Sequence, residues 1–204
     1  MNEFTKRELA TLKRLNTPAK IQDYLNALAF NFEKRGDTLM SPRKVLEKKA
    51  AHCFEGALFA AATLWVNGHK PLLLDLVPDM KKDDAHVVTL YKVNGYWGAI
   101  SKTNHAVLRF RDPIYKTVRE LALSYFHEYF LNTTGEKTLK TFAGPIDMSR
   151  FGTAWLTDED DLMYLHKKFD RLPHTSFVPT KNKKLLRKAD NVERKAGLIV
   201  EQKR

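Results

Sequence analysis

The stretch Lys48–Trp65, KKAAHCFEGALFAAATLW, decides the fold predicted for this chain. From Phe54 onward its residues are almost all small or apolar and favour a helix, and Gly68 and Pro71 follow as stop signals. A helix that is apolar on nearly every side is expected to run through the centre of a domain. Cys53, the single cysteine of the chain, falls in the first turn of this helix.

The position of Cys53 favours an ionised thiol. The first turn of a helix leaves backbone N–H groups without intrahelical acceptors and carries the positive end of the helix dipole, and both effects stabilise a thiolate. A lone cysteine is nevertheless more often an inert core residue than a nucleophile. The chemical interpretation therefore requires a base elsewhere in the chain.

The composition is that of an ordinary globular protein, with 204 residues, 43% hydrophobic and 29% charged. The formal net charge is +11, but residues 181–204 hold nine Lys or Arg against three acids, a net of +6. We therefore expect one domain at 1–180, with its core at about 20–130, and a basic C-terminal tail at 181–204 that has the composition of a solvated helix. The N-terminus is too polar for a signal peptide, no apolar run is long enough to span a membrane, and one cysteine excludes an internal disulfide; these features favour the cytoplasm.

Periodicity and capping signals predict the other elements. Helices are expected at 4–15, from Pro18 through Phe32, at 42–49, at 117–131 and at 158–169. Strands are expected at 71–77, 85–93, 96–101, 106–110 and 138–143, and residues 173–179 should be extended. The Asn94-Gly95 pair is a strong hairpin signal between two of these strands. The predicted fold class is therefore α+β, with the Cys53 helix packed on an antiparallel sheet and flanked by helices.

His86 is the best-placed candidate base among the seven histidines, because it starts a strand expected to lie beside the central helix. Counting outward from the Asn94-Gly95 turn puts His86 opposite Thr103, with Ser101 and Asn104 within a residue or two. Either side chain could hold the tautomer of the imidazole, as the third member of a nucleophile–base–orienter set does.

In this order of elements the sequence resembles the transglutaminase-like superfamily of papain-type cysteine enzymes, and within it the small bacterial members. The resemblance rests on Cys53 followed by FEGALFAAATLW, on His86 followed by VVTLY, and on the segment 95–101, GYWGAIS. It implies a papain-like fold with a catalytic triad in which Cys53 is the nucleophile and His86 the base. It also implies a peptide or protein amide or ester as substrate.

The third position departs from the family pattern, because Ser101 stands where the family carries its orienting Asp. Asn104 lies three residues on and could orient His86 through its amide oxygen, as an Asn does in papain-like triads. Asp75 and Asp112 are less well placed alternatives.

Three further residues are predicted to contact substrate. His52 could donate to the substrate or lower the thiol pKa, although a histidine in a charged approach segment is more often a solvated neighbour. The resemblance implies that Tyr96 and Trp97 shape the acyl site, although hairpin packing is the commoner role for such aromatics. A set of cations, Arg109, Arg111, Arg119 and Lys102, could line a cleft for acidic substrates or form a solvated face.

No metal or cofactor is predicted. A zinc site needs four convergent ligands, and Cys53 with His52 and His86 supplies three at most. The tail could bind nucleic acid, but no nucleic-acid motif accompanies it, and no membrane partner is expected.

Three functions remain open from the sequence. The first is a cysteine hydrolase or acyltransferase, a peptidase or amidase if water resolves the acyl-enzyme and a transglutaminase if an amine does. The second is a catalytically inactive binding module of the same fold, whose triad has decayed at the third position. The third is a nucleic-acid-binding protein that uses the basic tail.

Overall fold

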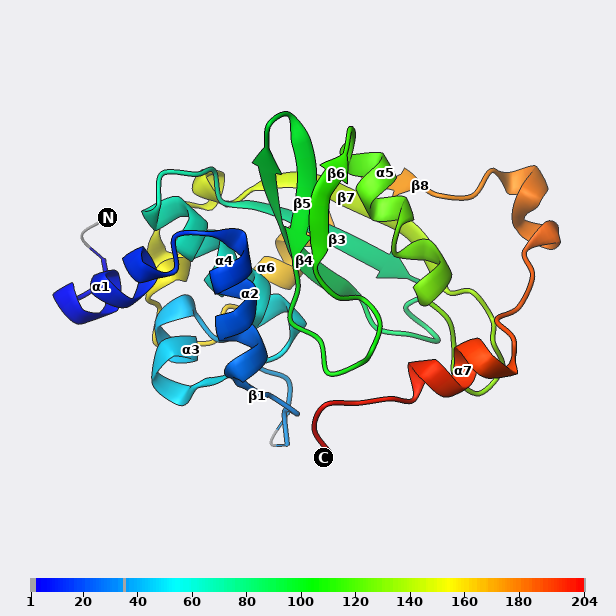
Figure 1. Ribbon diagram of the computed structural model, residues 1–204, viewed down its shortest axis with the longest axis horizontal. Coiled ribbons are helices and arrows are strands. Elements are labelled where there is room, and N and C mark those ends of the chain that lie inside the picture. Colours follow the sequence, from blue (N-terminus) through cyan, green and yellow to red (C-terminus); the bar gives the residue numbers. More distant parts are fainter. Residues whose placement is uncertain (1–2, 35, 204) are drawn as a thin grey trace.

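A six-stranded antiparallel sheet forms the centre of the computed structural model, which describes residues 3–34 and 36–203 (Figure 1). Met1, Asn2, Arg35 and Arg204, which fall in the predicted domain and tail, lie outside the described residues. The helices are α1 (Lys6–Arg14), α2 (Pro18–Ala27), α3 (Pro42–Lys48), α4 (Cys53–Val66), α5 (Val118–Leu123), α6 (Tyr164–Phe169) and α7 (Asn191–Gly197), with 3-10 turns η1 (Phe126–Glu128), η2 (Met148–Phe151), η3 (Ala154–Leu156) and η4 (Thr180–Leu185). The strands are β1 (Ala29–Phe30), β2 (Ala50–Ala51), β3 (Leu72–Pro78), β4 (His86–Val93), β5 (Tyr96–Ile100), β6 (Arg111–Tyr115), β7 (Leu139–Asp147) and β8 (Thr175–Ser176).

The strand order of the sheet is β6-β5-β4-β3-β7-β8, and every neighbouring pair is antiparallel. Helices α1 to α4 gather on one side, and α5 packs its apolar residues against the other (Figure 1). The short strands β1 and β2 pair in parallel just before α4. The predicted α+β class, a central helix on an antiparallel sheet with flanking helices, is confirmed.

Helix α4 is buried along most of its length because small and apolar residues cover all its faces. Every residue from Phe54 to Leu64 is buried. The helix lies on β4, where the Thr89 hydroxyl donates a 2.6 Å hydrogen bond to the Ala57 carbonyl. The N-terminus of α4 therefore sits close to the start of β4, where His86 lies.

Local signals place the neighbouring elements correctly. Thr17 and Ser41 cap α2 and α3 ahead of a proline at the start of each helix. Asn94 and Gly95 both have positive φ, at 50° and 87°, as the tight turn between β4 and β5 requires. The register follows from this turn, with Thr89 opposite Ile100.

The strand predicted at 106–110 is wrong, and residues 101–110 form a loop. The Ala106 N–H donates to the Ile199 carbonyl, and the Leu108 N–H donates to Glu128 Oε2, so the backbone groups a strand would use are taken by other partners. Leu108 also has φ +60°, which a strand does not allow. The next strand is β6, whose Pro113 is tolerated because β6 lies at the sheet edge.

Three predicted helices are too long. Helix α2 ends at Ala27, because the next residues pair as β1. Helix α5 stops at Leu123, where Ser124 Oγ bonds back to the Leu121 carbonyl and a 3-10 turn follows. The helix predicted from Asp158 begins at Tyr164, because the Asp158 side chain bonds the Asp160 N–H in a turn instead.

The end of the basic segment returns to the body of the protein. Glu201 N–H donates to the Asn104 carbonyl, and the Gln202 side chain accepts from the Phe30 N–H. In Figure 1 the red C-terminal chain runs from α7 back to the neighbourhood of β1. The segment 199–202 thus joins the 101–110 loop to β1.

Candidate active site

The N-terminus of α4 is capped by the residue that precedes the cysteine. His52 Nδ1 accepts from the Phe54 N–H at 3.2 Å, and Glu55 Oε2 accepts from the His52 N–H at 2.9 Å. This is a capping box in which a histidine takes the place of the usual Ser or Thr. It holds Cys53 as the first residue of the helix, with its own N–H among those that have no intrahelical acceptor.

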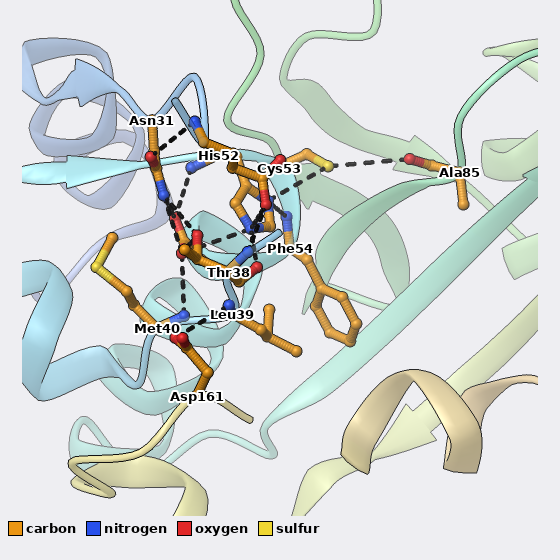
Figure 2. Close-up of polar contacts among 11 residues, drawn as sticks. Asn31, Thr38, Leu39, Met40, His52, Cys53, Phe54, Ala85 and Asp161 are labelled. Atoms are coloured by element: carbon orange, nitrogen blue, oxygen red, sulfur yellow. Dashed lines mark hydrogen bonds and ion pairs between the residues drawn. The ribbon is translucent and has the colours of Figure 1, made fainter. Parts of the chain in front are cut away.

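Cys53 is a half-buried residue, and its thiol lies between the start of α4 and the start of β4 (Figure 2). Its Sγ is 4.0 Å from His52 Nδ1 and 3.9 Å from the Ala85 carbonyl oxygen, which directly precedes His86. Burial alone would raise the pKa of the thiol, but hydrogen bonding and charge from His52 and His86 lower it to about 5. Cys53 is therefore a thiolate at neutral pH.

His52 couples to this thiolate. Its Nε2 lies 3.0 Å from the Thr38 carbonyl, and Nδ1 faces both the Phe54 N–H and the sulfur. Burial would lower the pKa of His52, but the Cys53 thiolate and the Glu55 carboxylate raise it to about 9. In the observed geometry Nδ1 accepts from the Phe54 N–H, so the ring proton lies on Nε2 and is donated to the Thr38 carbonyl; a proton on Nδ1 would give up this capping bond.

His86 is buried and held by a hydroxyl. Its Nε2 lies 2.8 Å from Ser101 Oγ, and Ser101 Oγ donates to the Leu108 carbonyl at 2.6 Å. Because a hydroxyl has one proton, Ser101 must accept from the His86 Nε2–H. The neutral imidazole therefore has its free lone pair on Nδ1, the ring nitrogen not engaged by Ser101. Ser101, which stands where the resemblance leads one to expect an Asp, therefore accepts a hydrogen bond from His86 and donates one to the Leu108 carbonyl.

Ser101 is fixed by a side chain that sequence reasoning missed. The Gln22 amide, on α2, donates to the Ser101 carbonyl at 2.7 Å and accepts from the Ser101 N–H at 2.9 Å. Ser101 is 1% exposed, so these bonds are shielded from water. The only signal in the sequence was a polar residue within the apolar stripe of an amphipathic helix.

Glu55 organises the segment in front of the site. Its fully buried carboxylate accepts from the Asn31 amide, the Thr38 hydroxyl and the Met40 N–H in addition to the His52 N–H. These bonds tie the chain at 31–40 to the start of α4. Glu55 therefore positions His52 in two ways. It accepts from the backbone N–H of His52, and it holds Thr38, whose carbonyl contacts the His52 ring.

Asn104 does not orient His86. Its amide donates to the Gln202 carbonyl and accepts from the Gln202 N–H, both at 2.9 Å. We expect Asn104→Ala to leave the alkylation rate of Cys53 within about twofold of wild type, and to cost about 1–2 kcal/mol in urea unfolding by releasing the C-terminal segment. An alkylation rate that falls tenfold or more would return Asn104 to the site.

Tyr96 and Trp97 lie away from Cys53. They follow the β4–β5 turn, whereas His86 is at the opposite end of β4, about 23 Å away along the strand. Trp97 stacks under the Lys92 ammonium, and Tyr96 is 40% exposed. Counting residues from the turn already places Tyr96 and Trp97 at the turn end of the hairpin and His86 at the other end. These aromatic side chains therefore do not shape a site at Cys53.

The proposed cleft of cations does not form. Lys102 is buried, and its Nζ donates to the Leu25 and Leu28 carbonyls at the end of α2. Arg109 pairs with Glu201, and Arg111 pairs with Glu128. Of the alternative carboxylates, Asp75 is buried in β3 on the same side of the sheet as α4, and Asp112 lies in the edge strand β6.

Within the described residues there is no cluster of three His, Cys, Asp or Glu side chains suited to a metal ion. In the same part of the chain, no helix has the length and apolar character needed to cross a bilayer.

Comparison with protein-family models gives no match, and comparison with curated proteins gives none. Among solved structures, the chain is similar to LapG of Legionella pneumophila, with a TM-score of 0.43 and 10% sequence identity over 74% of this chain and 82% of that chain. A similarity at this level establishes neither activity nor substrate, so the function is argued from the site itself.

Proposed function

We propose that this protein is a papain-type, transglutaminase-like cysteine enzyme that cleaves or transfers the acyl group of a peptide or protein amide or ester. The observation that carries the proposal is the position of Cys53 in the first turn of α4, with a thiol pKa lowered by His52 and His86, together with the hydrogen bond by which Ser101 holds His86 Nε2. Such a nucleophile and oriented base are the parts an acyl-enzyme mechanism needs.

The mechanism has two halves. His86 Nδ1 takes the proton of the Cys53 thiol, the resulting thiolate attacks the substrate carbonyl carbon, and the carbonyl electrons move onto oxygen. Collapse of this intermediate breaks the bond to the leaving amine or alcohol, which takes a proton from His86 Nδ1 and leaves an acyl thioester on Cys53. Water or an amine then gives its proton to His86 Nδ1 and attacks the thioester, which releases the acid or amide and regenerates the thiolate.

Ser101 has a positioning role in this mechanism. As a neutral acceptor it fixes the imidazole and its tautomer, although it stabilises the imidazolium less than a carboxylate would. The weaker stabilisation of the imidazolium is the reason for keeping a second candidate function, a binding module of the same fold without catalysis. The experiment below separates the two, because only the enzyme needs a reactive thiolate.

Alkylation by iodoacetamide tests the proposal directly, since Cys53 is the one cysteine in the sequence and the label reports on it alone. The rate should rise with pH through a midpoint near 5, and His86→Ala should move this midpoint upward by removing one source of positive charge. His69→Ala, an exposed histidine beyond the end of α4, is the matched control and should leave the profile unchanged. A midpoint near 9 in both wild type and His86→Ala would reject the enzyme and leave the binding module.

A further inference from the structure

Asp75 lies in the middle of β3, opposite Val87 of β4 on one side and Ala143 of β7 on the other. Both partners belong to the apolar core that surrounds α4, whereas Leu74 and Leu76 belong to the core on the opposite face of the sheet. Because side chains alternate along a strand, the Asp75 carboxyl faces α4. It is an acid placed under a helix whose first residue is the proposed nucleophile.

Asp75 is 6% exposed as a residue, and its buried Oδ1 has no hydrogen-bond partner among the described residues. A buried ionised carboxylate without a partner is strongly disfavoured, so the group is expected to hold a proton. Burial first, and then the negative charges of Cys53 and Asp170, raise the pKa of Asp75 to about 7, against a smaller lowering by His86. The charge of Asp75 in turn contributes to the raised pKa of Tyr129.

A neutral carboxyl has one O–H donor that needs an acceptor. The proposed reaction creates an acceptor here, the oxyanion on the substrate carbonyl. The α4 N-terminus supplies one donor, the Cys53 N–H. The side-chain amides that could supply a second are occupied, because Gln22 holds the backbone of Ser101 and Asn31 holds Glu55.

We propose that protonated Asp75 is a further catalytic residue, which donates its O–H to the substrate oxyanion as the second member of an oxyanion hole with the Cys53 N–H. This inference rests on the proposed function and adds a residue to the same site. As Sγ bonds to the carbonyl carbon, the carbonyl electrons move onto oxygen, and that oxygen accepts both hydrogen bonds. When the electrons return and the leaving group departs, Asp75 still holds its proton.

Two reactions of Cys53 separate this role from a structural one. Acylation by p-nitrophenyl acetate passes through an oxyanion, whereas alkylation by iodoacetamide does not. Asp75→Leu removes the donor along with an unpartnered buried carboxyl, so the variant should fold. Its acylation should be slower than wild type by roughly 10²- to 10³-fold, the loss typical of one oxyanion donor, while its alkylation stays within about threefold.

The conservative variant supplies the rescue. Asp75→Asn keeps a neutral N–H donor, so it should acylate at least about tenfold faster than Asp75→Leu. In wild type the ratio of acylation to alkylation should fall as pH rises through about 7, because Asp75 loses the proton it donates, and in Asp75→Asn this fall should disappear. The comparison leaves the groups coupled to Asp75 unchanged, so their titration contributes equally in both proteins. These groups are Cys53, His86, Asp170 and Tyr129.

The outcomes are distinct from those that test the enzyme itself. Equal losses of acylation and alkylation in Asp75→Leu, or no loss of either, would overturn the role of Asp75 while Cys53 remained a reactive thiolate. Failure of wild type to acylate, together with an ordinary alkylation profile, would instead overturn the proposed function. Selective loss of acylation with recovery in Asp75→Asn supports the assignment.

Discussion

His86→Ala is expected to stop turnover of p-nitrophenyl acetate after one equivalent, with the acetyl group left on Cys53. The first half of the reaction needs little help, because the thiolate is already formed and p-nitrophenolate leaves without a proton. The second half needs a base, since neutral water is a weak nucleophile. Deacylation should therefore slow by roughly 10²- to 10⁴-fold, the usual contribution of a general base.

A burst of p-nitrophenolate followed by a flat trace, with the acetylated chain seen by mass spectrometry, would show this result. Wild type should give the burst and continue to release product. His69→Ala should behave as wild type because His69 is exposed. If His86→Ala turns over at the wild-type rate, another group is the base, and His52, the second histidine beside Sγ, becomes the first to examine by the same substitution.

Glu55→Ala is expected to cause the largest loss of stability, roughly 3–5 kcal/mol in urea unfolding. The carboxylate is fully buried and accepts from the Asn31 amide, the Thr38 hydroxyl and two backbone N–H groups, those of Met40 and His52. Removing it leaves these donors without an acceptor in a site that water does not reach.

Two variants calibrate this measurement. Glu55→Gln keeps the volume and one acceptor oxygen, so it should lose less, about 1–3 kcal/mol. Glu47→Ala removes an exposed carboxylate from α3 and should change stability by no more than about 0.5 kcal/mol. A Glu55→Ala variant as stable as Glu47→Ala would mean that the segment 31–40 does not depend on this carboxylate.

The sequence by itself determined the parts of the site that follow from local chemistry. The apolar run after Cys53 has to be a buried helix, and the Asn94-Gly95 turn sets the register of the β4–β5 hairpin. Counting from that turn was enough to bring His86 near Ser101, because a strand register is fixed once its turn is known. Cys53 and His86 as the reacting pair remain proposals that rest on this geometry.

Only the tertiary structure decided which side chains complete the site. Gln22 and Ser101 are 79 residues apart, and Asn104 and Gln202 are 98 apart, so no local pattern carries either contact. The contact with Gln202 holds Asn104 away from His86, and the contact with Gln22 fixes the backbone of Ser101. Asp75 sits in an apolar strand where its neighbours predict a core residue, and only the packing of α4 over the sheet shows that this buried acid lies on the face that α4 covers. Periodicity encodes which face of an element is buried, whereas the identity of the group it meets depends on how distant elements pack.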